Sequence, residues 1–447
     1  MDGAVPPKLL TVLSHAADIV RSHDFIHVFS HYDADGISAA SIVAKTLARA
    51  GKEFSVRLFT TLDDEAASVI RGSGAECVVV TDLGASYVKE FDAMPFDVVV
   101  FDHHTVGDEA QRICYANPHL HGIDGMTSGC GATMAFLFAI AMDESNWDLV
   151  QVAMAGIAGD RQHINGLLGL NSYLLSEGKK RSLVKVSEGS LIPCGRLKDS
   201  LFISTDPYVR GVSGNEDGVR KILSEAGVSG DKDFSELSPE EAQRLSSSIA
   251  LRLAAQNVSL QAMFETARTR YHLPDWKMDA ETFATLLNGC GRTGLEGLGV
   301  CAAMGDAECL EGARRMEAVY SRQVLEAVVA LDGAGTVELE NIQWFDSSAS
   351  GFTGVVCGVA MQFIGNPGKP VIGVNRSGDS AKVSSRGTWA LLDRGVDLSA
   401  ALKRACEAVG GNGGGHKIAS GGSFPSARTE EFLHVLDKII GEQVSAK

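Results

Sequence analysis

Three short apolar segments, each followed closely by acidic or histidine residues, constrain the fold of this chain more than any other feature. They are residues 25–29 (FIHVF), 78–80 (VVV) and 98–101 (VVVF). Near-continuous apolar runs of this length are typical of strands that are buried on both faces of a parallel sheet. A helical stretch at residues 37–50 follows the first segment and ends at Gly51. The pattern predicts an α/β domain with helices on both faces of its sheet.

The composition is that of a soluble globular protein of two or three domains, with 447 residues, 45% hydrophobic and 21% charged. Apolar runs such as residues 134–142 are shorter than the ~20 residues that a membrane-spanning helix needs. The N-terminus lacks the pattern of a secretory signal. Nine singly spaced cysteines predict reduced thiols, not disulfides or a zinc site. We therefore expect a cytoplasmic protein that does not contact a membrane.

The charge is strongly acidic but unevenly distributed. Lys and Arg number 40 against 56 Asp and Glu, a net charge of −16, which argues against non-specific coating of nucleic acid. Residues 369–447 carry 11 basic and 8 acidic residues, a net charge of +3. An anionic substrate could be bound by this C-terminal region, or through metal ions that reverse the sign of an acidic pocket.

The periodicity divides the chain into three parts. Residues 1–178 contain the apolar strands and two further helices, predicted at residues 128–142 and 148–158. Residues 179–334 are predicted to form a linker and a mostly helical insert. Residues 335–447 are predicted to form a smaller α/β domain.

Acidic and histidine side chains stand where apolar segments end. In chain order they are His31, Asp33, Asp35, Asp82, Asp102, His103, His104 and Asp160. In an open parallel sheet, ligands bind beyond the carboxyl ends of the strands, so these side chains could meet at one place. They would repel one another there unless cations lay between them. A mixed set of His and Asp without Cys suits Mn²⁺, Mg²⁺ or Fe²⁺.

Each cluster taken alone also has a structural interpretation. Residues 33–36 (DADG) can form a turn or a helix cap, and Asp82 can cap the helix that follows it. Residues 102–104 (DHH) can be a capped strand end, and residues 159–160 (GD) a helix end. All four clusters occur in one chain, each at the end of an element, which favours the functional interpretation.

The series resembles the motifs of the DHH phosphoesterase superfamily. The similar stretches are residues 31–36 (HYDADG), Asp82, residues 102–104 and residues 159–160. Residues 382–386 (KVSSR) and 413–416 (GGGH) resemble the DHHA1 substrate-binding domain that usually accompanies it. Softer similarities to archaeal RecJ-like exonucleases, including GINS-associated nucleases, are residues 117–119, 122–125, 206–207, 211–215 and 287–292.

The resemblance implies two divalent cations, with Mn²⁺ preferred and Mg²⁺ as the alternative. The implied ligands of the first are His31, Asp33 and Asp82. The implied ligands of the second are Asp35, Asp82, His103 and Asp160, so that Asp82 bridges both ions.

His104, Asp82 and Asp102 are the candidate catalytic residues. We expect His104 either to contact the scissile phosphate and assist proton transfer, or to orient His103 or Asp102. Asp102 is expected to accept a hydrogen bond from a ligand imidazole.

The glycine run at residues 410–415 could be a flexible linker. Because it lies inside an α/β unit, we expect its amides to form an anion nest before a short helix, with Arg386 as a bidentate partner for phosphate. The candidate substrate-binding residues are Ser384, Arg386, Gly413, Gly414, Gly415 and His416. Ser128 could cap the helix that follows it. Arg292 has two open interpretations, contact with nucleic acid and bracing of the domains.

The expected function is that of a RecJ-type exonuclease on single-stranded DNA or RNA ends, in replication or repair. Its active site would lie in the cleft between the DHH and DHHA1 domains. One alternative is a phosphatase or phosphodiesterase for small substrates, such as oligoribonucleotides, bisphosphorylated nucleosides or cyclic dinucleotides. A second alternative, of another class, is a replisome scaffold that binds GINS or a helicase.

Overall fold

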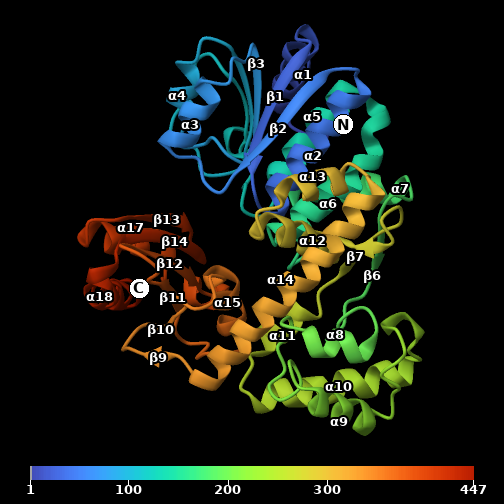
Figure 1. Cartoon of the computed structure of the whole chain (residues 1–447), viewed down its shortest axis with the longest axis vertical. Coiled ribbons are helices and arrows are strands. Elements are labelled where there is room, and N and C mark those ends of the chain that lie inside the picture. Colours follow the sequence, from blue (N-terminus) through green and yellow to red (C-terminus); the bar gives the residue numbers. More distant parts are fainter. Residues whose placement is uncertain (1–2, 447) are drawn as a thin grey trace. The chain divides into compact units, whose positions relative to one another are not determined.

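The computed structural model describes residues 3–446, which form two compact units (Figure 1). The first unit extends to Glu188 and also includes Arg268–Tyr320. The second comprises Gly189–Ala267 and the residues from Ser321 onward. The insert predicted over residues 179–334 is therefore shared by both units, and the division into three domains stays a prediction.

A five-stranded parallel sheet forms the centre of the first unit, which confirms the predicted fold class. Its order is β2-β1-β3-β4-β5, and every neighbouring pair is parallel. The strands are β1 (Phe25–His31), β2 (Glu53–Phe59), β3 (Cys77–Thr81), β4 (Asp97–Phe101) and β5 (Cys114–Ala116). The apolar runs predicted β1, β3 and β4. The two outer strands escaped prediction because β2 is an edge strand with many exposed side chains and β5 is only 3 residues long.

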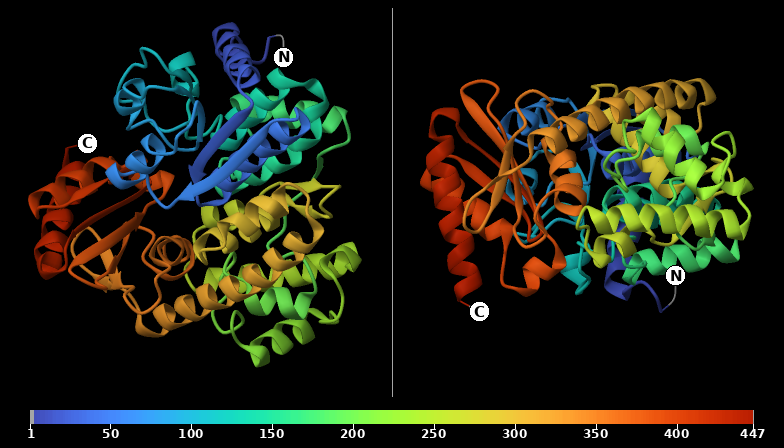
Figure 2. Two further views of the ribbon diagram at one scale, coloured as in Figure 1. Left: turned by 45° about the horizontal axis from the view of Figure 1, so that its top comes forward. Right: turned by 90° about the horizontal axis from the view of Figure 1, so that it is seen from below.

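Alternate side chains of the central strands enter two hydrophobic cores. Val79 packs in the core formed with α1, α2, α5 and α6, whereas Val78 and Val80 pack in the core formed with α3 and α4. Figures 1 and 2 show helices beside both faces of this sheet. The helices are α1 (Pro7–Ser22), α2 (Ala34–Arg49), α3 (Asp64–Arg71), α4 (Val88–Asp92), α5 (Gly131–Met142), α6 (Val150–Gly159) and α7 (Gly169–Lys180). Burial on both faces explains why β3 is apolar along its length.

Residues 268–320 complete the first unit. They add α12 (Ala280–Arg292), which packs on α2 and α6, and α13 (Glu296–Ala303), which packs on α2. Before α12 in the chain, β7 (Arg270–Leu273) and β8 (Met278–Asp279) form a small antiparallel sheet with β6 (Lys185–Ser187). The long helix α14 (Ala307–Ala334) begins in this unit and ends in the second.

The second unit contains a six-stranded mixed sheet in the order β13-β14-β12-β11-β10-β9. Only β10 and β11 pair in parallel. The strands are β9 (Val337–Glu338), β10 (Gln343–Asp346), β11 (Val371–Asn375), β12 (Ser380–Arg386), β13 (Asn412–His416) and β14 (Ala419–Pro425). The C-terminal α/β arrangement agrees with the predicted fold class.

The helices of the second unit are α8 (Leu197–Ile203), α9 (Glu216–Ala226), α10 (Pro239–Ala255), α11 (Leu260–Thr266), α15 (Thr353–Val359), α16 (Trp389–Asp393), α17 (Leu398–Ala408) and α18 (Thr429–Ser445). α17 packs on β13 and β14, and α15 packs on β11 and β12.

One expectation about the second unit is wrong. The glycine run does not form a nest before a short helix, because Asn412–His416 is an edge strand that pairs antiparallel with β14. The absence of side chains lets this strand lie close to α17, where a Cβ on Gly413 would be 2.9 Å from the carbonyl oxygen of Leu402.

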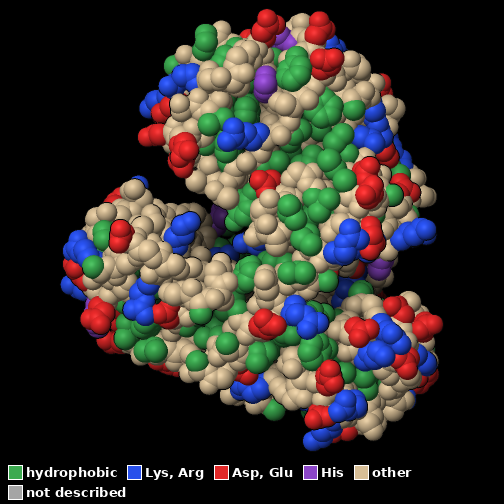
Figure 3. Space-filling model, viewed as in Figure 1, with side chains coloured by type: hydrophobic (Ala, Val, Ile, Leu, Met, Phe, Trp, Pro, Cys, Tyr) green, Lys and Arg blue, Asp and Glu red, His purple; other side chains and the backbone are tan. Residues whose placement is uncertain are grey.

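Within residues 3–446, none of the helices combines the length and the apolar character needed to cross a membrane. All nine cysteines are free thiols. On the face drawn in Figure 3, acidic and basic side chains are interspersed around α9 and α10. Arg220 with Asp217 and Arg252 with Glu225 are ion pairs of that region, so its positive charge is locally compensated.

Candidate active site

The turn from β1 into α2 holds the first two predicted metal ligands together. Asp33 is the N-cap of α2, where its Oδ1 accepts a hydrogen bond from the backbone N–H of Gly36 at 3.1 Å. Its other oxygen lies 3.0 Å from Nδ1 of His31. Burial would raise the pKa of Asp33, but His31 first and then the N–H of Gly36 and Arg292 hold it well below its usual range.

Asp35 is buried at the N-terminus of α5. Its Oδ2 accepts a hydrogen bond from the N–H of Gly131 at 2.7 Å, and its Oδ1 accepts one from Ala132 at 2.9 Å. These are donors that the first turn of a helix leaves without an intrahelical partner. Ser128 does not cap α5 as expected, because the N-cap residue is Cys130 and the carboxylate of Asp35 takes the capping role.

Asp82 follows β3 in a left-handed backbone conformation, with a φ of 54°. Only 2% of its surface is exposed. Its Oδ2 lies 3.4 Å from Nδ1 of His31, and its Oδ1 lies 3.3 Å from Nε2 of His103. The two oxygens of this carboxylate therefore face two different histidines.

The ring of His103 is buried between a carbonyl group and three carboxylates. Its Nδ1 donates to the carbonyl oxygen of Gly125 at 2.8 Å, so Nε2 is the unprotonated nitrogen of the neutral ring. That Nε2 is buried and has no hydrogen-bond partner among residues 3–446. It faces Asp82, and it lies 3.5 Å from Oδ2 of Asp160 and 3.9 Å from Oδ2 of Asp35.

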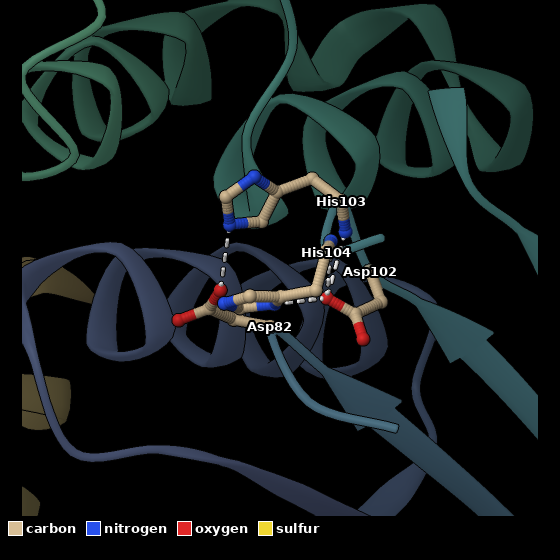
Figure 4. Close-up of side chains that lie close together, drawn as sticks. All are labelled: Asp82, Asp102, His103 and His104. Atoms are coloured by element: carbon tan, nitrogen blue, oxygen red, sulfur yellow. Dashed lines mark hydrogen bonds and ion pairs between the residues drawn. The ribbon is translucent and has the colours of Figure 1, made fainter. Parts of the chain in front are cut away.

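Asp102 and His104 form a pair beside Asp82 and His103 (Figure 4). Asp102 is fully buried, and its Oδ1 lies 2.7 Å from Nδ1 of His104. The same carboxylate accepts hydrogen bonds from the N–H groups of His103 and Ala85. The sequence predicts that Asp102 accepts a hydrogen bond from the imidazole of a metal ligand. Asp102 contacts the imidazole of His104 instead, because the ring of His103 is bonded to Gly125.

The charges in this group call for a cation. Burial, and then the neighbouring Asp82 and Asp160, raise the pKa of Asp35 well above its usual range. Burial also raises the pKa of Asp160. Burial would lower the pKa of His103, but Asp160 and Asp82 more than offset this and raise it. Positive charge is therefore favoured among these carboxylates, and the unpartnered Nε2 of His103 is a ready nitrogen ligand.

Ligand atoms of the six predicted metal residues form two groups, and a third group joins Asp82 and His103 to Asp102 and His104. One group is His31, Asp33 and Asp82, and another is Asp35, His103 and Asp160, with the ligand atoms of each within 4.8 Å of one another. All six predicted metal residues thus come together in the first unit. They lie at the end of β1, at the start of α2, directly after β3, shortly after β4 and at the end of α6. The donor set of carboxylate oxygens and imidazole nitrogens fits divalent Mn²⁺ or Mg²⁺.

The predicted substrate-binding residues all belong to the second unit. Ser384 of β12 and Gly414 of β13 both lie opposite Gly421 of β14. Arg386 donates from Nη1 to the carbonyl oxygen of Ser385 at 2.9 Å. Gly354 of α15 lies beside it, since a Cβ there would be 3.3 Å from Nη2 of Arg386.

Several residues around the site were not found from the sequence. Gln162 donates to Oδ2 of Asp160 at 3.0 Å, and Asn288 of α12 accepts from the N–H of Ala34 at 3.1 Å. A buried amide carries no periodic signal that separates it from a surface amide. Asn288 lies in residues 287–292, and the resemblance of this stretch to archaeal RecJ-like exonucleases is the one signal in the sequence that points to it.

Comparison with known proteins identifies the family. Residues 25–157 match the DHH family, N-terminal domain, and residues 345–442 match the DHHA1 domain. The chain therefore belongs to the DHH/DHHA1 superfamily. It is 29% identical over 436 residues to an uncharacterized protein of Methanocaldococcus jannaschii, with 95% of each chain covered.

Solved structures show that the fold is RecJ-like. RecJ of Thermus thermophilus in complex with Mn²⁺ has a TM-score of 0.62 at 18% identity; the match covers 98% of this chain and 55% of that one. An exonuclease RecJ bound to manganese has a TM-score of 0.59 at 17% identity, with 98% and 95% covered. CDC45 of Entamoeba histolytica has a TM-score of 0.65 at 10% identity, with 97% and 99% covered.

Proposed function

We propose that this chain is a two-metal-ion phosphodiesterase that removes nucleotides from an end of single-stranded DNA or RNA. The RecJ-like DHH/DHHA1 fold supports a metal-dependent phosphoesterase. The finer assignment rests on the site. His31, Asp33 and Asp82 would hold one divalent cation, and Asp35, Asp82, His103 and Asp160 would hold the other.

The position of Asp82 carries this proposal. Its two oxygens face His31 and His103, which belong to the two different groups of ligand atoms. This arrangement is expected of a carboxylate that bridges two ions. We propose Mn²⁺ as the native ion, since both RecJ neighbours described above contain it, with Mg²⁺ as the alternative.

When bound, the two cations would neutralise charge on the phosphate and lower the pKa of an attacking water. The protein would contribute a mostly buried set of carboxylates to hold them. Asp35 is fixed by two backbone N–H groups of α5, and Asp82 by a hydrogen bond from its own N–H to the carbonyl oxygen of Phe101.

His104 is the proposed proton-transfer residue. Its side chain is 43% exposed, whereas that of His103 is only 1% exposed. Burial would lower the pKa of His104, but the carboxylate of Asp102 raises it overall. Asp102 orients the ring by its hydrogen bond to Nδ1, and Nε2 is the atom that would donate the proton. The leaving oxygen of a cleaved phosphodiester needs such a proton.

The second unit would supply phosphate contacts. Arg386 has a guanidinium group suited to bidentate binding of phosphate, and Ser384 lies two residues away on the same strand. We propose that Gly413, Gly414, Gly415 and His416 also take part in binding the nucleic acid backbone.

The fold of CDC45 favours a second candidate, a scaffold that binds GINS or a replicative or repair helicase. A small-substrate phosphodiesterase with the same chemistry is the other alternative. The complete set of carboxylate and imidazole ligands supports an enzyme over a scaffold alone.

The test is digestion of end-labelled single strands of DNA and RNA, with Mn²⁺, Mg²⁺ or a chelator. The exonuclease proposal expects products that shorten progressively with a cation and no products with the chelator. Rapid hydrolysis of a dinucleotide with no cleavage of the long strand would support the small-substrate alternative. No hydrolysis of either substrate would reject the enzyme and leave the scaffold.

Asp82→Asn tests the bridge, with Asp97→Asn as its matched control. Asp97 lies at the start of β4 in the same sheet, and its half-exposed carboxylate pairs with His23. We expect Asp82→Asn to abolish hydrolysis and Asp97→Asn to retain it. Near-normal turnover by Asp82→Asn would contradict the two-ion assignment.

A further inference from the structure

A buried amide, Gln162, connects two of the proposed metal ligands from outside the ligand set. Gln162 lies two residues after Asp160, just beyond the end of α6, and only 6% of it is exposed. Its Nε2 donates to Oδ2 of Asp160 at 3.0 Å and to the carbonyl oxygen of Gly125 at 2.8 Å. That carbonyl oxygen is the one that accepts from Nδ1 of His103.

The orientation of this amide is determined by its partners. Oε1 of Gln162 accepts from the backbone N–H of Gly129 at 3.1 Å, and a backbone N–H can only donate. It also accepts from Nδ2 of Asn171 at 2.7 Å. Asn171 is in turn held by the hydroxyl of Thr133, which donates to its Oδ1 at 2.6 Å.

The four hydrogen-bonding positions of the Gln162 amide are therefore all used. Two acceptor positions bind Gly129 and Asn171, and two donor positions bind Gly125 and Asp160. A saturated buried amide of this kind has one allowed orientation. It can transmit that orientation to the groups that it contacts.

We propose that Gln162 is a positioning residue that sets the orientation of Asp160 and His103 for one of the two cations. The inference rests on the proposed function, because it uses the ligand assignment made there. One donated hydrogen bond directs the carboxylate of Asp160. The other holds the carbonyl group that keeps the proton of His103 on Nδ1 and its Nε2 toward the carboxylates. Such outer partners typically change metal affinity by ~10–100-fold.

Gln162 contacts only one of the two groups of ligand atoms. Asp160 and His103 belong to the group with Asp35, and both hydrogen bonds that the amide donates act on this group. Neither of them goes to His31 or Asp33 of the other group. Loss of the amide should therefore weaken the binding of one ion and leave the binding of the other unchanged. A general loss of stability would weaken both.

The test is Gln162→Met, titrated with Mn²⁺ by calorimetry and by electron paramagnetic resonance of free Mn²⁺, using the full chain stripped of metal. Methionine keeps the length of the side chain but cannot donate a hydrogen bond. We expect one of the two Mn²⁺ dissociation constants to rise by ~10–100-fold and the other to stay as in the wild type.

Gln151→Met is the matched control. Gln151 is also a buried glutamine, 1% exposed, and it lies in α6, where its Nε2 donates to Asp275 at 2.5 Å. The control should bind both ions as the wild type does. Normal binding of both ions by Gln162→Met, or equal weakening of both, would overturn the inference. A wild-type chain that binds no Mn²⁺ would overturn the proposed function as well.

Asn171→Ala supplies a second test if Gln162→Met does not fold, as judged by circular dichroism. This change removes one donor to Gln162 but leaves Gln162 itself in place. We expect the same single ion to be weakened, by a smaller factor. Unchanged affinity for both ions in Asn171→Ala would then overturn the inference.

Discussion

The carboxylate of Asp35 caps a helix that begins 96 residues later, where the backbone N–H of Gly131 donates to its Oδ2 at 2.7 Å. The positive end of α5 thus lies against an acidic group of the candidate site. The same carboxylate therefore belongs to the candidate site and also connects α2 to the N-terminus of α5.

Gly131→Ala should damage the site directly. A Cβ at this position would lie 2.7 Å from Cβ of Asp82 and 3.0 Å from Oδ2 of Asp35. We expect a loss of ~1–3 kcal/mol in the free energy of unfolding, as for other overpacked sites, together with weaker Mn²⁺ binding. Urea denaturation and Mn²⁺ titration measure the two effects. Gly107→Ala is the control, since no atom would lie within 4 Å of its Cβ; equal behaviour of the two variants would contradict the expectation.

Two glycines in neighbouring helices should respond in opposite directions. In α12, a Cβ on Gly291 would overlap the carbonyl oxygen of Tyr32, so Gly291→Ala should destabilise by ~1–3 kcal/mol or more. In α13, Gly297 has open space around it, and Gly297→Ala should stabilise by up to about 1 kcal/mol through helix propensity. Urea denaturation of both variants checks the signs. A destabilised Gly297→Ala with a neutral Gly291→Ala would show that α12 does not pack on the β1–α2 turn.

Glu281 should make the stability of the first unit depend on acid pH. Burial would raise the pKa of Glu281, but His163 first and then Arg268 hold it well below its ordinary value of 4.5. Because the folded pKa lies below the unfolded one, the stabilisation is complete above pH 4.5 and is lost as the pH falls toward the folded pKa.

Glu281→Gln should therefore cost roughly 1–3 kcal/mol near neutral pH, and the difference from the wild type should shrink on acidification. Denaturation measured over a series of pH values gives this difference. A difference that grows as the pH falls would have the wrong sign and would reject the role of Glu281.

His104→Ala should impair turnover without removing the ions. A positioned proton donor contributes about 10²–10⁴-fold, so we expect kcat to fall by that factor while both Mn²⁺ affinities are retained. His23→Ala is the control, because His23 also pairs with an aspartate, Asp97 at 2.9 Å, but precedes β1 at its other end. Loss of Mn²⁺ binding in His104→Ala would identify His104 as a ligand instead.

Arg386→Ala should weaken the binding of anionic substrates. Loss of a charge-assisted hydrogen bond costs about 1.5–3 kcal/mol, which corresponds to a rise in KM of ~10–100-fold with unchanged metal content. Steady-state kinetics and metal analysis measure the two quantities. Arg404→Ala, on the exposed face of α17, is the control. A chain that lost metal on mutation of Arg386 would place this residue in a different role.

Much of the first unit could be predicted from residue patterns. Strands that are buried on both faces are apolar along nearly their whole length, which is why β3 and β4 could be predicted. β1 is only partly buried, and its apolar residues 25–29 were enough to predict it. The exposed edge strand β2 and the short β5 carry no such pattern. The glycine run at residues 410–415 was misjudged, because glycine disfavours strands by propensity and only pairing with β14 makes Asn412–His416 one.

The metal residues stood out because carboxylates and imidazoles at the ends of apolar strands are chemically distinctive. Their partners did not. Gln162 and Asn288 are ordinary amides in the sequence, and the contact of His103 with Gly125 involves a backbone carbonyl group that every residue possesses.

The linear order of residues is enough to predict a parallel sheet with its three inner strands, the identity of the acidic and imidazole groups and their position at the ends of elements, because side-chain type and local periodicity are properties of short segments. Only the folded chain decides which oxygen of Asp82 faces which histidine, that Asp35 caps α5 and that Gln162 holds Asp160. Hydrogen bonds and charge interactions act over a few ångströms, so they depend on which distant segments come into contact.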